Sequence, residues 1–279
     1  MSMLRAIMEY QFLQYAIIAA FLSSIVGGLV SVVIVEKKLV MMTGGVAHTS
    51  YGGVGLGYLL GFEPILGAFF FAVIAAIGIG FIKNRLTGIK DIVIAMFWSL
   101  GMALGVLFIT MKPGYPPELT SYLFGNILSV TRFDLSLMAI LTVIVVLVFF
   151  IFYQDWKAHL FDQEFTKIIG KKTGLLENVL LILLAITVVV LIRVVGIILV
   201  IALLSVPAAT ASLLTGKLHK RIIFSMGFSL IFVLLGLIIS YYTDYSSGAV
   251  IVFVAITMYI IIARLKAHLT KNFFKKIKV

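Results

Sequence analysis

The stretch ENVLLILLAITVVVLIRVVGIILVIALLSVPAATASLL, residues 177–214, carries one charge, Arg193, after its first position. A helix needs about 20 apolar residues to cross a hydrocarbon core of about 30 Å, so this stretch is too long for one crossing. It therefore predicts two membrane-spanning helices joined by a turn. We place that turn at Arg193, because a charge is costly inside lipid.

The rest of the 279-residue chain has the same character. It is 62% hydrophobic and 12% charged, whereas a soluble globular chain is about 45–50% apolar and about 25% charged. Apolar runs predict nine spans, at about 13–35, 39–61, 64–82, 91–111, 134–153, 177–193, 194–214, 222–242 and 247–264. We expect an all-α, polytopic integral membrane protein with a single domain, 1–279. Residues 118–130, in a segment broken by Pro and Gly, are expected to form a short re-entrant or surface helix.

The distribution of charge predicts the orientation of the chain. Nine spans place the two termini on opposite sides of the membrane. If the C-terminus is cytoplasmic, the cytoplasmic loops hold all but four of the 22 Lys and Arg, the exceptions being Arg5, Lys112, Arg132 and Arg193. Basic residues collect in cytoplasmic loops, so the N-terminus is expected outside and the C-terminus inside. The net charge of +11 therefore indicates contact with the lipid bilayer and no nucleic acid.

Missing motifs exclude several kinds of chemistry. The chain has no cysteine, so disulfides and thiolate ligands are excluded. It contains no G-x-x-x-x-G-K-[ST] phosphate loop, no H-E-x-x-H and no G-x-S-x-G motif, the usual marks of a P-loop ATPase, a zinc protease and a serine hydrolase. We expect a transport protein that is no enzyme, binds no permanent cofactor and takes its energy from elsewhere.

One histidine, His48, lies among glycines in GGVAHTSYGGVGLGYLLG, residues 44–61. At 100° per residue, four glycines fall within about 60° of it on a helix. These four are Gly44, Gly45, Gly52 and Gly55. Small residues let a neighbouring helix approach closely, so the imidazole is expected to point into the protein. Either it hydrogen-bonds a neighbouring helix, or it contacts a metal or other substrate on a translocation pathway.

The loop of residues 154–176 is expected to face the cytoplasm. Its apolar residues Leu160, Phe161, Phe165, Ile168 and Ile169 fall at helical spacing. Gly170 follows as a helix stop. We expect one short amphipathic helix that lies on lipid or inserts into a groove on a partner protein.

Pro207 lies inside the apolar run 194–214. It has no N–H, so it is expected to break or kink the helix near Leu203. The freed carbonyl groups, with Ser205 and Thr210, either line a pathway or belong to an ordinary structural kink.

The segment SYYTDYSSGAVIV, residues 240–252, falls at the predicted outer end. Asp244 either accepts a cation at the entrance, or one of Asp244, Ser246 and Ser247 caps the last helix. Three further external carboxylates are expected to attract cations, those of Glu63, Glu118 and Asp134.

These segments, in this order, resemble the membrane permeases of ABC importers for zinc, manganese and iron(II), the ABC-3 family. GGVAH at 44–48 is similar to the family's G-D-A-x-S-H, and LFGNILSV at 123–130 to its L-F-G-D-x-L-x-V. FDQEFTKIIG at 161–170 resembles its coupling region, D-x-E-x-A-x-x-x-G. VGIILVIALLSVPAATA at 195–211 is the most specific match, to G-x-L-L-V-x-A-L-L-x-x-P-A-A-T-A, and residues 240–249 resemble its S-Y-x-x-D-x-P-S-G-A.

The resemblance implies residue roles and also exposes departures. Gly44 stands where the family has an aspartate paired with the histidine, Asn126 where it often has aspartate, and Ser246 replaces its proline. Candidates for the translocation pathway or a metal are His48, Gly44, Asn126, Ser205, Pro207 and Asp244. Candidates for coupling to an ATPase are Asp162, Glu164, Phe165 and Gly170. Without the aspartate, one imidazole fits no metal's preference closely.

The resemblance further implies a homodimeric permease in the cell membrane that moves a divalent transition metal inward. A separate cytoplasmic ATP-binding subunit would dock on residues 158–170, and an extracellular or periplasmic metal-binding protein would deliver the metal. Two alternatives stay open: a permease of the same fold for another small solute, such as a metal chelate, and an ion-coupled secondary transporter. The second is disfavoured, because ion coupling usually uses carboxylates inside the spans.

Overall fold

The computed structural model describes residues 7, 9–85, 90–113, 125–168 and 170–277, and nearly all of these are helical. The long helices are α2 (Gln11–Glu36), α3 (Val40–Leu60), α4 (Pro64–Arg85), α5 (Lys90–Met111), α7 (Arg132–Phe161), α9 (Thr173–Val195), α12 (Leu218–Thr243) and α13 (Ser247–Ile277). The shorter elements are the 3-10 turn η1 (Ile127–Ser129), α8 (Gln163–Ile168), α10 (Ile197–Leu203) and α11 (Val206–Leu214). The all-α expectation is confirmed.

Within the described part of the chain, eight segments are long and apolar enough to cross a membrane, with α10 and α11 together counting as one segment. The ninth predicted span is α3. It has 21 residues, which is a spanning length, but Gly, Ser, Thr and His lower its hydropathy. Most of its residues are buried against other helices, so this span mainly meets protein.

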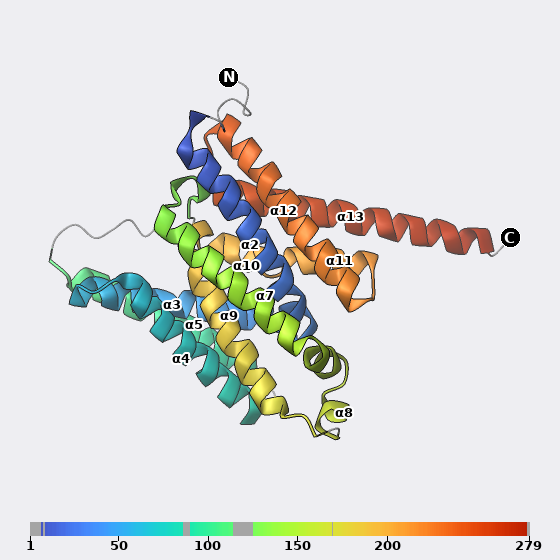
Figure 1. The fold of residues 1–279 in the computed structure, drawn as a ribbon, viewed down its shortest axis with the longest axis horizontal. Helices are drawn as coiled ribbons and strands as arrows, with labels where there is room; N and C mark the ends of the chain where they lie inside the picture. Colours follow the sequence, from blue (N-terminus) through green and yellow to red (C-terminus); the bar gives the residue numbers. More distant parts are fainter. Residues whose placement is uncertain (1–6, 8, 86–89, 114–124, 169, 278–279) are drawn as a thin grey trace.

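The helices form two groups around a common centre (Figure 1). Helix α3 packs against α4 and α5 on one side, and α2 packs against α7 and α12 on the other. Helix α9 joins the groups, because it contacts α3, α4 and α7. Helices α2 and α9 are the most buried spans, whereas α7 and α13 expose most of their surface. The long apolar runs therefore separate into central helices and helices that face the surroundings.

The turn in the stretch 177–214 lies at Gly196, so its placement at Arg193 is wrong by three positions. Gly196 has φ of +82°, a conformation that glycine adopts without steric cost. Arg193 stays in the last turn of α9, since carboxylates on neighbouring segments pair with it there. The predicted break before Pro207 is confirmed, because α10 ends at Leu203 and α11 begins at Val206.

The predicted cytoplasmic helix is wrong as a single element. Helix α7 runs on to Phe161, the backbone of Asp162 is extended, and α8 then begins. Asp162 occupies the N-cap position of α8, where aspartate is favoured. The expected apolar stripe is therefore divided: Leu160 packs against the core, while the side chain of Ile168 is 82% exposed. Gly170 has φ of +77° and follows α8, as a helix stop should.

The predicted re-entrant or surface helix at 118–130 falls mostly outside the described residues. Its described end consists of Gly125, Asn126 and the single turn η1. Gly125 lies directly against the backbone of the turn between α9 and α10. This segment therefore reaches the centre of the bundle at one end of the molecule.

Candidate functional site

His48 lies half-buried on α3, and its hydrogen bonding settles which ring nitrogen carries the proton. Its Nδ1 is 2.9 Å from the carbonyl oxygen of Gly44, one turn earlier. A carbonyl oxygen can only accept, so Nδ1 donates and Nε2 keeps its lone pair in the neutral ring. The indole of Trp98, from α5, stacks on the imidazole with ring centroids 3.9 Å apart and planes 19° from parallel.

The glycines beside His48 bring a neighbouring helix, α5, close to α3, as the sequence predicts. A Cβ atom at Gly52 would lie 3.0 Å from the carbonyl oxygen of Gly101, and one at Gly55 would lie 2.6 Å from that of Gly105. The hydroxyl of Thr49 also donates to the carbonyl oxygen of Phe97 at 2.9 Å. We call this contact, from residues 44–55 of α3 to residues 97–105 of α5, the α3–α5 interface. At Gly52 and Gly55 it leaves no room for a side chain between the two backbones.

Gly44 faces side chains rather than a backbone. A Cβ atom there would lie 3.1 Å from Cζ3 of Trp98 and 3.7 Å from Cδ1 of Ile201 on α10. The position where the resembling family has an aspartate is therefore enclosed by an indole and an isoleucine. Gly44 and His48 are brought together with α5 and with the broken helix α10.

Ser205 and Pro207 lie at the break between α10 and α11. The hydroxyl of Ser205 donates to the carbonyl oxygen of Ile201 at 2.7 Å, and that of Thr210 donates to Val206 at 2.7 Å. Both hydroxyl donors are therefore used by the backbone four positions back in their own segments. Pro207 itself is buried. A pathway role for Ser205 and Pro207 stays a prediction.

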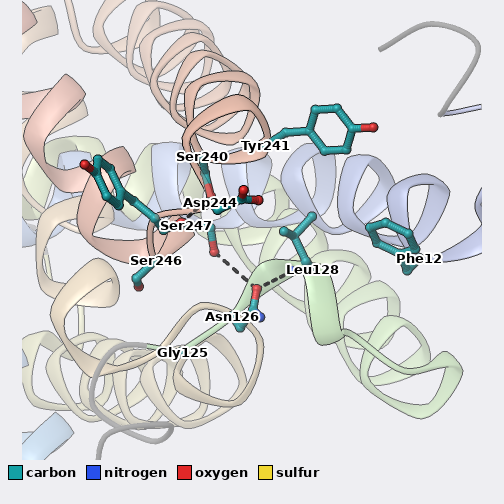
Figure 2. Close-up of a pocket in the computed structure, with 10 residues that line it drawn as sticks. Phe12, Gly125, Asn126, Leu128, Ser240, Tyr241, Asp244, Ser246 and Ser247 are labelled. Carbon is teal, nitrogen blue, oxygen red and sulfur yellow. Dashed lines mark hydrogen bonds between the residues drawn. The ribbon is translucent and has the colours of Figure 1, made fainter. Parts of the chain in front are cut away.

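A second candidate region is a polar pocket of about 400 Å³ at the end of the molecule predicted to face outward. Figure 2 shows its lining, which comes from α2, the segment around η1, and the turn between α12 and α13. The residues are Phe12, Gly125, Asn126, Leu128, Ser240, Tyr241, Asp244, Tyr245, Ser246 and Ser247. We call this the outer polar pocket. It unites Asn126 with Asp244 but contains neither His48 nor Gly44.

Hydrogen bonds fix Asn126 in the outer polar pocket (Figure 2). Its Oδ1 accepts the backbone N–H of Leu128 at 3.0 Å and the hydroxyl of Ser247 at 3.4 Å. Asp244 ends α12 with φ of +55°, and α13 begins only at Ser247. The capping interpretation is therefore wrong for Asp244, whose backbone closes the preceding helix. Its exposed carboxylate lines the pocket.

Arg193 neutralises much of the expected external negative charge. Its Nε is 2.5 Å from Oδ1 of Asp134, and its other end is 3.0 Å from Oε1 of Glu63. Thr131 donates to the second carboxylate oxygen of Asp134 at 2.6 Å. Both carboxylates expected to attract cations are therefore paired with Arg193: Asp134 fastens α7 to α9, and Glu63 fastens the turn between α3 and α4 to α9. Glu118 lies outside the described residues.

Over the part of the chain that the structure describes, no group of three or more His, Asp and Glu side chains is close enough to hold a metal ion. His48 is thus a lone candidate ligand. A divalent transition metal normally takes several ligands, and His48 by itself offers one.

The coupling candidates lie at the opposite, predicted cytoplasmic end. Asp162 and Glu164 are exposed on either side of the start of α8, and the side chain of Phe165 is not among those described. The ammonium group of Lys37, in the turn between α2 and α3, donates to the carbonyl oxygen of His159 at 2.9 Å. The end of α7, which leads into α8, is therefore tied to the start of α3.

Trp98 was missed by the sequence analysis, as was the pairing of Arg193. The signal for close packing was present on α5, where Gly101 and Gly105 lie four positions apart. Nothing in the sequence joins Trp98 to His48, since 50 positions separate them and both lie in apolar runs.

Comparisons with known proteins agree with this arrangement. Residues 9–266 match the sequence pattern of the "ABC 3 transport family". The chain is 34% identical over 261 residues to the manganese transport system membrane protein MntC of Listeria monocytogenes, covering 94% of this chain and 93% of the relative. It is 32% identical over 254 residues to a protein of Haemophilus influenzae that is named an iron transport system membrane protein, covering 91% and 93%.

A solved structure agrees as well. The fold matches a chain of PsaBC from Streptococcus pneumoniae, solved in complex with Fab, with a TM-score of 0.84 and 31% identity over 93% of each chain. The family pattern covers α2 through α12 in full, α3 and the broken α10–α11 pair included, and most of α13. This multi-pass membrane protein therefore belongs to the ABC 3 transport family.

Proposed function

We propose that the chain is the membrane-spanning permease subunit of an ABC importer that carries a divalent transition metal ion into the cytoplasm. The relatives named for manganese and iron transport support this, since they align over more than nine-tenths of the chain. Manganese, iron(II) or zinc would be the transported substrate and would not be a permanently bound cofactor. The observation that carries the proposal is the state of His48, which keeps the lone pair of Nε2 available inside the family-matched region.

The hydrogen bond of His48 supports a metal contact in a specific way. Metal-binding histidines usually donate their second ring N–H to a carbonyl or carboxylate, which fixes the ring and raises the basicity of the ligand nitrogen. In this protein the carbonyl oxygen of Gly44 accepts the hydrogen bond from the second ring nitrogen, Nδ1. A single imidazole would bind weakly, and weak binding suits a conduit, because a metal held tightly on the pathway would not be released.

Energy would come from a separate ATP-binding subunit on the cytoplasmic side, docked on α8 and the ends of the loop 154–176. Asp162 and Glu164 supply exposed charge there, and Gly170 supplies the turn that follows. Phe165 stays a coupling candidate from the sequence. The bond from Lys37 to the His159 carbonyl oxygen supports a mechanical route from this region to α3. Movement at α8 would reach the helix that carries His48.

The complete importer would contain two copies of this permease in the cell membrane and an extracellular or periplasmic protein that delivers the metal. The N-terminus would lie outside and the C-terminus in the cytoplasm. A reporter fused after Val279 tests the orientation: activity confined to the outside of the cell would overturn it.

One observation favours a related cargo as a second candidate. The outer polar pocket, at about 400 Å³, is far larger than a bare ion and is lined by hydroxyl, amide and carboxylate groups. A small metal chelate would fit the same fold and the same energy source. Competition between the free ion and its chelate in uptake assays would separate the two cargoes.

The deciding experiment is reconstitution into liposomes. Co-purified permease and ATPase should accumulate Mn²⁺ when ATP is present on the ATPase side, and the permease alone should accumulate none. Uptake by the chain alone without ATP would instead mean an ion-coupled secondary transporter. Glu164→Lys and Phe165→Asp should leave the permease folded but lower both its co-purification with the ATPase and its uptake. Unchanged values would assign the α8 region to the lipid surface.

A further inference from the structure

The indole of Trp98 touches two parts of the proposed metal contact at once. It stacks on the imidazole of His48, with centroids 3.9 Å apart and an interplanar angle of 19°. The same ring also closes the space over Gly44, where a Cβ atom would lie 3.1 Å from Cζ3 and 3.6 Å from Cη2. One aromatic side chain of α5 thus covers both ends of a helical turn of α3.

Positions four apart on a helix share one face, so a side chain at position 44 is placed to act together with that of His48. A carboxylate there would be a second ligand for a cation held by Nε2. The indole and Ile201 enclose that position instead. The enclosure is built into the packing of three helices, because the atoms come from α3, α5 and α10.

The backbone of α5 beside Trp98 is tied to α3. Phe97, the neighbour of Trp98, accepts the hydroxyl of Thr49 at 2.9 Å. Farther along, α3 and α5 meet backbone to backbone at Gly55 and Gly105. These two contacts hold α5 beside α3 at positions that flank Trp98, which keeps the indole next to the imidazole.

We propose that Trp98 is a positioning residue that makes the metal contact a single-ligand one. Its stacking holds the imidazole with Nδ1 on the Gly44 carbonyl, so that Nε2 stays available, and its edge excludes a second ligand from position 44. The cargo is thereby held by one nitrogen and released readily. This inference rests on the proposed function and assigns a cause to the weakness of the contact.

The first experiment restores the excluded ligand with and without the indole. Purified Gly44→Asp and the double variant Gly44→Asp/Trp98→Ala are titrated with Mn²⁺. Bound ion is measured from the loss of the electron paramagnetic resonance signal of free Mn²⁺. The double variant should bind about tenfold more tightly than Gly44→Asp, within the range by which neighbouring groups change metal affinity. Gly44→Asn/Trp98→Ala is the matched control, equal in size without the charge, and should bind no better than wild type. Equal affinity of Gly44→Asp and the double variant overturns the inference.

The second experiment uses Trp98 as its own reporter. The chain contains two tryptophans, so Trp156→Phe leaves Trp98 as the sole indole. Trp156 packs edge-on against Phe149 within the core, and phenylalanine keeps an aromatic ring there. Mn²⁺, which is paramagnetic, should quench the fluorescence of Trp98 when it reaches His48. It should leave the emission of Trp156 in the Trp98→Phe protein unchanged. Equal quenching of both tryptophans would place the ion elsewhere and overturn the inference.

Uptake measurements then separate positioning from packing. Trp98→Phe retains a flat ring that can stack on the imidazole and should keep uptake within about twofold of wild type. Trp98→Leu has no such ring, and its uptake should be several-fold lower than that of Trp98→Phe. Equal uptake by the two variants overturns the positioning role. If His48→Ala leaves uptake intact, the proposed function itself fails. The two can fail separately. Suppose His48→Ala abolishes uptake, but Trp98→Leu takes up as much as wild type and Gly44→Asp binds Mn²⁺ as tightly as the double variant. The proposed function then stands and this inference falls.

Discussion

The α3–α5 interface holds the predicted pathway residues Gly44 and His48, the outer polar pocket holds Asn126 and Asp244, and the two regions are built in opposite ways. At the interface, glycines bring two backbones into contact and two aromatic rings lie face to face. In the pocket, hydroxyl, amide and carboxylate groups surround about 400 Å³ of space. Side chains in the pocket are therefore free to change without loss of the fold, whereas at the interface function and packing share the same atoms.

The largest expected effect is the loss of folded protein when a side chain is added at the interface. Gly55→Ala places a Cβ atom 2.6 Å from the Gly105 carbonyl oxygen, so the two helix backbones would have to separate. Overpacking of this kind costs about 3 kcal/mol. The thermal unfolding midpoint in detergent should fall sharply. Gly227→Ala, on α12 where a Cβ atom meets nothing within 4 Å, is the matched control and should be neutral or slightly stabilising.

The next effect is on transport and decides what His48 does. His48→Ala removes the ligand nitrogen and should lower ATP-driven Mn²⁺ uptake about tenfold, with membrane insertion and ATPase association unchanged. His48→Asn keeps a polar group that can hydrogen-bond but binds transition metals poorly. Uptake should stay low in both variants. Full recovery with asparagine would mean that His48 is a packing residue.

A smaller effect is expected at the ion pairs that flank the pathway helices. Arg193→Gln leaves the carboxylate of Asp134, 8% exposed, without its partner. Losing one member of a buried pair costs about 3–5 kcal/mol, and because Arg193 is one-third exposed we expect about 2 kcal/mol. Chemical denaturation of purified protein measures it. Glu63→Gln is the control: its side chain is 55% exposed, so the loss should stay below about 1 kcal/mol. Equal losses would mean that burial does not govern this cluster.

The smallest effect should come from the pocket. Asp244→Asn keeps a residue that tolerates the left-handed backbone, so stability should change by less than about 0.5 kcal/mol. Removal of the charge should raise the Mn²⁺ concentration for half-maximal uptake about twofold, and more at low salt, where attraction of a cation is least screened. Ser246→Ala, in the same pocket, should leave that concentration unchanged. A fall in stability as large as that of Arg193→Gln would show that the pocket is as tightly packed as the interface.

Features that depend on neighbours along the chain were predictable from the sequence. The apolar runs placed the spans, since a helix must cover the hydrocarbon core whatever surrounds it. Pro207 placed the break after Leu203, since a missing N–H acts within one turn. The glycines around His48 correctly indicated a close approach by another helix.

The errors concern features that depend on distant contacts. A charge in an apolar run was read as a turn, but Arg193 remains helical because Asp134 and Glu63 reach it from other segments. The apolar residues 160–169 were read as one stripe, but Asp162 starts a new helix and Leu160 joins the core. In both cases local periodicity was correct and a partner from elsewhere in the chain changed the outcome.

By itself, the sequence determined that this protein crosses a membrane many times, that it carries no ATPase motif, and that one histidine lies on a glycine face. These follow from composition and helical period, which need no knowledge of neighbours. Only the tertiary structure decided that Trp98 lies on His48, that Gly44 is enclosed, and that Asn126 and Asp244 share a pocket. Such pairings join residues 50 to 157 positions apart. They are set by how apolar helices of similar composition fit together, which one-dimensional patterns do not specify.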